Sequence, residues 1–98
     1  MVQRRFQVRG EVDLATADAL EAKLRVLAVV TADDVILDCR DLTFIDSMGI
    51  GVFERFHRNL EAQDRQLRVV NMNEHVRRPF DVLGLTERFG IGELDWAN

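Results

Sequence analysis

The sequence has 98 residues, enough for one folded domain, and we expect a single domain over residues 1–98. Apolar residues make up 47% and charged residues 31%, which excludes a disordered chain and predicts a hydrophobic core. The formal net charge of -4 argues against a general nucleic-acid binder, which needs a basic face to neutralise phosphates. No apolar run is long enough to span a bilayer, and no secretory signal follows MVQRRF, so we expect a cytoplasmic protein without direct membrane insertion.

The N-terminal part of the chain predicts a strand followed by a helix. Residues 5–12 alternate between apolar and polar side chains, which is typical of a half-buried strand, with an irregularity at Gly10. Thr16 is a favourable N-cap residue for a helix over residues 17–29. Within that range the apolar residues recur at helical spacing: Leu20, Leu24 and Leu27.

The remainder of the chain continues the alternation of strands and helices. Residues 35–37 form a short apolar run, which predicts a strand buried on both faces and therefore a parallel or mixed sheet. The later predicted segments are a connection at 41–43, strand residues 44–45, a helix to about Gln63, a strand at 67–70, a helix capped by Asn73 that contains Pro79 and ends near Gly84, and a short strand at 91–94.

This order of elements predicts an α/β fold with a single mixed sheet of about four strands and helices packed mainly on one side. Right-handed crossovers put the first two helices on the same face, unless the strand order reverses between them.

The segment TFIDSMGIGVF is the most informative stretch. Asp46 and Ser47 are both N-cap types, whereas Gly49 and Gly51 are poor helix formers. Glycines at this place indicate either a close approach to the backbone or tight packing of the helix on the sheet. Because free N–H groups and the helix dipole favour an anion, a serine at a helix start is also a favourable place for a phosphate. The residues alone leave two interpretations open for Ser47, a simple N-cap position or a phosphate acceptor.

Several other kinds of chemistry are excluded by spacing. His57 and His75 have no partner at metal-ligand spacing, and His57 lies about three turns beyond Ser47, out of reach as a catalytic base. The chain has neither a Gly-x-Ser-x-Gly elbow nor a phosphate-binding loop of the Gly-Lys-Ser/Thr type. We therefore expect a protein that is not an enzyme and uses no metal or cofactor. We interpret the lone cysteine, Cys39, as an inert core residue. We also place four phenylalanines in the core: Phe44, Phe53, Phe56 and Phe80.

Four segments, in order and over about nine tenths of the chain, resemble anti-sigma factor antagonists of the STAS domain family. They are GEVDLATADAL, DVILDCRDLTFID, IDSMGIGVF and VRRPFDVLGLTERFGI. The third resembles the family's Asp-Ser-x-Gly-Leu-Gly-Val signature, and the first its Gly-Glu-Leu-Asp-x-x-Thr-Ala segment.

The resemblance implies a phosphorylation switch. In such proteins the serine is phosphorylated by a serine kinase that is also an anti-sigma factor, the unphosphorylated antagonist binds that kinase and releases the sigma factor, and a phosphatase reverses the change. The implied acceptor is Ser47, with Asp46 orienting its hydroxyl and Gly49 letting the partner approach. The implied partner-binding residues are Asp13, Thr16, Asp46, Ser47, Met48, Gly49 and Ile50.

The chain also departs from the family pattern. Met48 stands where many members have a small polar residue. We also expect the terminal strand and helix to be abbreviated, which would expose apolar surface and favour a homodimer or a constant partner. The alternative function is an adaptor subunit of a lipid-transport ATPase complex that binds constitutively, and a weaker third is a detached module of a signalling assembly. Genome neighbourhood would separate the first two.

Overall fold

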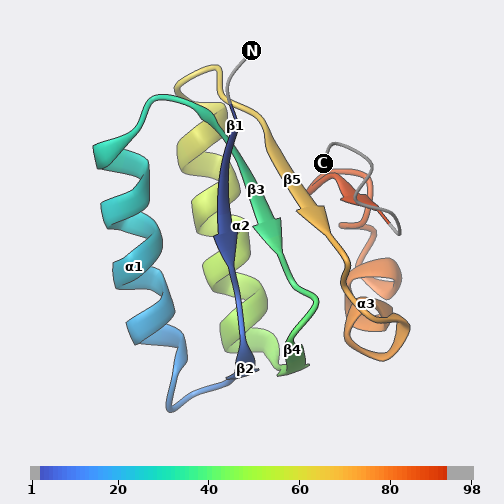
Figure 1. Ribbon diagram of the computed structural model, residues 1–98. Coiled ribbons are helices and arrows are strands. Elements are labelled where there is room, and N and C mark those ends of the chain that lie inside the picture. Colours follow the sequence, from blue (N-terminus) through green and yellow to red (C-terminus); the bar gives the residue numbers. More distant parts are fainter. Residues whose placement is uncertain (1–2, 93–98) are drawn as a thin grey trace.

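The computed structural model describes residues 3–92 and has the predicted α/β alternation (Figure 1). The elements are β1 (Gln3–Gln7), β2 (Gly10–Val12), α1 (Ala17–Val30), β3 (Asp34–Asp38), β4 (Leu42–Ile45), α2 (Ser47–Glu61), β5 (Leu67–Val70), α3 (Glu74–Val82) and β6 (Ile91–Gly92). The end of the last predicted strand, at 93–94, lies outside the described residues. None of the described helices is long and apolar enough to cross a membrane.

Two strand groups carry the fold. Four strands form a sheet in the order β1-β3-β5-β6, and β2 pairs separately with β4. The predicted α/β fold class is confirmed. The sheet was predicted to be mixed, whereas every strand pairing described is parallel. The central strand β3 is buried on both faces, as its apolar sequence predicts. Residues 42–43 were expected in a connection but belong to β4, where Leu42 is fully buried.

The strand predicted at residues 5–12 is divided at its centre. Gly10 has a φ of 74°, and the pairing register of β2 with β4 shifts between Gly10 and Glu11. Glycine adopts this left-handed conformation without steric cost, so the chain can leave β1, which pairs with β3, and enter β2. The irregularity expected at Gly10 is thereby confirmed, and it gives the chain a second, smaller strand pair.

The first two helices lie side by side on one face of the sheet, as right-handed crossovers require (Figure 1). They cover a core that includes Phe53 and Phe56. The ring of Phe80 from α3 lies 5.8 Å from that of Phe53, so α3 closes the core from another side. The interpretation of Phe44 as a core residue is wrong, because 44% of its surface is exposed.

The third helix begins as predicted. The side chain of Asn73 accepts a hydrogen bond from the N–H of Val76 at 2.9 Å and donates one to the carbonyl of Leu42 at 3.3 Å. This second bond fixes the start of α3 against β4. Pro79 lies inside the helix, which is short and ends at Val82, two residues before the expected Gly84.

Cys39 is fully buried, as expected. Burial, together with the nearby carboxylate of Asp38, raises the pKa of its thiol to about 12. The thiol therefore stays protonated and packs as a small apolar side chain.

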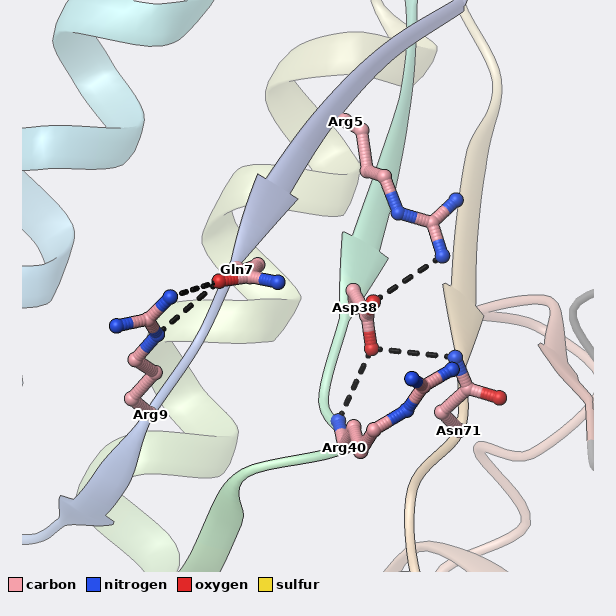
Figure 2. A network of polar contacts seen from close by, with 6 residues as sticks. All are labelled: Arg5, Gln7, Arg9, Asp38, Arg40 and Asn71. Carbon is pink, nitrogen blue, oxygen red and sulfur yellow. Dashed lines mark hydrogen bonds and ion pairs between the residues drawn. The ribbon is translucent and has the colours of Figure 1, made fainter. Parts of the chain in front are cut away.

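A polar network lies on the face of the sheet that points away from α1 and α2 (Figure 2). The buried carboxylate of Asp38 accepts hydrogen bonds from the guanidinium of Arg5 at 3.1 Å, the backbone N–H of Arg40 at 3.1 Å and the side-chain amide of Asn71 at 3.2 Å. Burial acts to raise the pKa of Asp38, but these hydrogen bonds and the charge of Arg5 outweigh it, so the pKa is lowered. The network joins β1 and the end of β3 to the chain segments that follow β3 and β5.

We expect Asp38→Asn to lower the free energy of unfolding by roughly 1–3 kcal/mol at neutral pH, because an amide cannot accept all of these bonds. Since folding lowers the pKa of Asp38, its charged form stabilises the fold above the ordinary aspartate pKa of 3.8, and this stability is lost as the pH falls through the folded pKa. Urea denaturation across that range should therefore show a difference between wild type and variant that shrinks with acid. Asp41→Asn, at an exposed aspartate on the same connection, is the matched control and should change little.

Candidate functional site

The site forms where two connections leave the sheet at the same end. The parallel pairing aligns Val12 of β2 with Ile45 of β4, and the N–H of Asp46 donates to the carbonyl of Val12 at 3.1 Å. Because parallel strands point the same way, residues 13–16 after β2 and residues 46–49 after β4 emerge together. Two of the four segments that carry the family resemblance, GEVDLATADAL and IDSMGIGVF, are thus neighbours in space.

The connection before α1 is held by Asp13. Its carboxylate accepts hydrogen bonds from the N–H groups of Ala15 at 2.9 Å and Thr16 at 3.2 Å. The hydroxyl of Thr16 turns back to donate to the carbonyl of Glu11 at 2.7 Å and makes no bond to the helix backbone. Thr16 is the N-cap residue of α1, as predicted, but its side chain makes no capping bond because β2 lies close enough to take its hydroxyl.

Asp46 is the N-cap of α2. Its carboxylate accepts hydrogen bonds from the N–H groups of Met48 at 2.9 Å and Gly49 at 3.2 Å. Ser47 is therefore the first helical residue and not the cap, which answers the question that the sequence left open about capping. Its side chain is exposed, and no hydrogen bond within residues 3–92 involves its hydroxyl. The expectation that Asp46 orients this hydroxyl is not met, because the bonds that the Asp46 side chain accepts come from the backbone N–H groups of Met48 and Gly49.

Gly49 lets α2 pack closely inside the fold, whereas the expected role was to let a partner approach. It is buried, and a Cβ atom built there would lie 2.6 Å from Cγ1 of Ile45 and 2.8 Å from the carbonyl oxygen of Val12. The missing side chain lets α2 pack against β2 and β4, so the expectation that Gly49 admits a partner is corrected. Tight packing of the helix on the sheet is the interpretation that the geometry favours.

The other predicted partner-binding residues differ in exposure. Thr16, Ser47 and Met48 are exposed, while Asp13, Asp46 and Ile50 are half-buried. Ile50 also packs against the core, so little of it is available to a partner.

Two exposed apolar residues near this site were missed by the sequence analysis. Leu14, in the connection before α1, is 74% exposed. Phe44 is 44% exposed and comes shortly before Met48 in the sequence, which is 45% exposed. A signal for both was present: Leu14 falls outside the periodic leucines of α1, and Phe44 precedes the inward-pointing Ile45, so alternation directs it outward. Exposed apolar side chains around a polar turn are typical of a protein-binding surface.

The electrostatics of the site bear on a phosphate at Ser47. The N–H groups of Met48 and Gly49 already bond to Asp46, so these two are not the free donors that the helix start was expected to offer. A phosphate would lie near the carboxylates of Asp46 and Asp13 and would add up to about two negative charges to an acidic turn. Within residues 3–92 no three or more His, Cys, Asp or Glu side chains lie close enough together to hold a metal ion.

The STAS domain model matches residues 4–94. The chain belongs to the STAS domain family. Among curated relatives, the anti-sigma-B factor antagonist of Bacillus subtilis (strain 168) is 34% identical over 84 residues, which are 86% of this chain and 76% of the relative. The family resemblance of the sequence is thus confirmed.

Solved STAS structures share the fold. The anti-sigma factor antagonist SpoIIAA in its unphosphorylated form matches with a TM-score of 0.79 at 25% identity, over 97% of this chain and 84% of that one. A sulfate transporter family protein from Wolinella succinogenes matches with a TM-score of 0.77 at 21% identity, over 95% of this chain and 79% of that one. Because one fold serves both kinds of protein, function has to be argued from the site and from the closer relatives.

We expect Gly49→Ala to lower the free energy of unfolding by about 1–3 kcal/mol, because the added methyl group meets the backbone of Val12. Gly51 on the same helix is the matched control. A Cβ there meets only the flexible end of Arg55 at 3.3 Å, so Gly51→Ala should be neutral or stabilise by up to about 1 kcal/mol through helix propensity. Chemical denaturation of both variants measures the difference, and equal effects would contradict the packing role of Gly49.

We expect Asp46→Ala to cost about 1 kcal/mol of stability, the typical loss for an N-cap. Ser47→Ala should stay within about 0.5 kcal/mol of wild type, because the serine hydroxyl is exposed. Thermal unfolding followed by circular dichroism tests the pair. A large loss for Ser47→Ala would mean that Ser47 has a structural role.

Proposed function

We propose that this STAS domain is an anti-sigma factor antagonist controlled by phosphorylation of Ser47. The observation that carries the proposal is an exposed serine hydroxyl at the first position of α2, beside the Asp13 connection and apolar Met48. Support comes from the curated relative, named as an anti-sigma-B factor antagonist, and from SpoIIAA, whose structure is described by its phosphorylation state.

The proposed switch has two states. With Ser47 unmodified, the domain binds an anti-sigma factor serine kinase, and the sigma factor is released. The kinase then transfers the γ-phosphoryl group of ATP to the Ser47 oxygen, which gives phosphoserine and ADP and displaces the hydroxyl proton. A phosphatase hydrolyses the phosphoserine to serine and inorganic phosphate. The domain contributes the acceptor and a binding surface, and we propose that it is not itself an enzyme.

The surroundings of Ser47 explain why a phosphate would weaken binding. The hydroxyl lies next in the chain to exposed Met48 and half-buried Asp46, and the Asp46 carboxylate already accepts hydrogen bonds from the helix backbone. A phosphate adds charge and bulk where a partner would have to exclude water, and the N–H groups of Met48 and Gly49 already serve Asp46. The capped helix keeps its own hydrogen bonds, so the change acts on the interface.

The cellular setting completes the proposal. An antagonist of a sigma-factor regulator would act in the cytoplasm. Self-association stays a prediction, and light scattering measures it. The transport-adaptor alternative predicts constitutive binding and no need for a phosphate at Ser47.

The test is to incubate the protein with ATP and the anti-sigma factor serine kinase encoded near it, and to locate the phosphate by mass spectrometry. We expect one phosphate at Ser47 and none in Ser47→Ala. Kinase binding should be retained in Ser47→Ala and weakened at least about tenfold in Ser47→Asp, because a charge enters a desolvated interface. Equal binding by wild type and Ser47→Asp would favour the constitutive adaptor.

A further inference from the structure

A groove between β4 and α3 lies next to the proposed switch. Its volume is about 450 Å³, and it is lined by Phe44, Ile45, His75, Val76, Arg78, Pro79 and Val82. Ile45 is two residues before Ser47, so their Cα atoms are at most about 7.6 Å apart. The groove therefore begins two residues before the serine along the chain.

The lining of this groove combines apolar and cationic groups. Phe44 and Val82 are 44% and 79% exposed, an unusual exposure for large apolar side chains placed on opposite walls of one groove. The only lining residues that can carry charge are His75 and Arg78, both exposed and both basic. Within residues 3–92 the guanidinium of Arg78 has no hydrogen-bond or ion-pair partner.

The groove is also held in place. Asn73 caps α3 and bonds to the carbonyl of Leu42 in β4, so the two walls are joined by a hydrogen bond just below the groove. Buried Val76 and Ile45 form the floor. A preformed groove costs little entropy when a partner enters it.

We infer that this groove receives a segment of the anti-sigma factor kinase in which an apolar side chain is flanked by a carboxylate. The apolar side chain fits between Phe44 and Val82, and the carboxylate meets Arg78 and His75. Charge complementarity selects an acidic segment over a neutral or basic one. The inference rests on the proposed function, because it takes the kinase to be the molecule that covers Ser47.

The groove also gives the phosphate a direct means of weakening the complex. An acidic segment seated in the groove would bring a carboxylate to the side of the molecule where Ile45 leads into Ser47, and so toward a phosphate on that serine. The two negative groups repel each other across a surface that has lost its water. Phosphorylation would thus act on the occupant of the groove as well as on the contacts of the turn itself.

The first test measures binding of the purified kinase that phosphorylates Ser47 by isothermal titration calorimetry. We expect Val82→Glu and Arg78→Glu each to weaken binding at least about tenfold, since both oppose an acidic apolar segment. Val29→Glu is the matched control, an equally exposed valine on α1, at 85%, and should bind within about twofold of wild type. Circular dichroism checks that all three variants are folded.

The outcomes separate the two proposals. If Ser47→Asp weakens binding while Val82→Glu and Arg78→Glu bind like wild type, the groove is not used and the phosphorylation switch stands. If the kinase neither binds nor phosphorylates the wild-type chain, the proposed function fails and the inference about the groove fails with it.

A photocrosslink identifies the occupant directly. A benzoylphenylalanine placed at Val82 should crosslink to the kinase, whereas the same group at Val29 should not. Mass spectrometry of the adduct should locate an apolar residue within a few positions of Asp or Glu. A crosslink from Val82 to a second copy of this chain, or to a basic segment of the kinase, would overturn the inference.

Discussion

The close contact of Gly49 with Val12 sets the geometry of the whole site. A Cβ atom at Gly49 would lie 2.8 Å from the carbonyl oxygen of Val12, and that same carbonyl accepts the N–H of Asp46 at 3.1 Å. The start of α2 is therefore pressed against the end of β2. Because β2 and β4 run parallel, this contact brings the connections that follow them together, although more than 30 residues of sequence separate Asp13 from Asp46.

This arrangement separates rigid parts of the site from the part that can be modified. The carboxylates of Asp13 and Asp46 are bonded to backbone N–H groups and hold the two helix starts. Ser47 contributes nothing comparable to the fold, and its exposed hydroxyl is available for chemistry. A phosphate can then change the charge of the surface while the capping bonds persist. The same division extends to the groove, whose walls are joined by Asn73 while Phe44 and Val82 remain exposed.

Much of this could be predicted from local sequence. The periodic leucines of α1, the apolar run of β3 and the caps Thr16 and Asn73 depend on near neighbours in the chain, so spacing is sufficient to find them. The failures concern contacts with distant segments. The side chain of Thr16 makes no capping bond, because its hydroxyl bonds to Glu11 of a strand whose position depends on β4. Phe44 was assigned to the core because its type is apolar, whereas the pleat of β4 turns it outward.

The motifs of the sequence by themselves carried the STAS resemblance, and its pattern determined the α/β class and a helix that begins close to Ser47. The fold class and the helix follow from composition, periodicity and spacing, which act over a few residues. Only the tertiary structure decided that Gly49 serves internal packing, that Asp46 bonds to the backbone and leaves the serine hydroxyl alone, and that β4 and α3 enclose a basic, apolar groove. These depend on which strands pair and how closely a helix approaches them, and such distances are set by the packing of the whole chain.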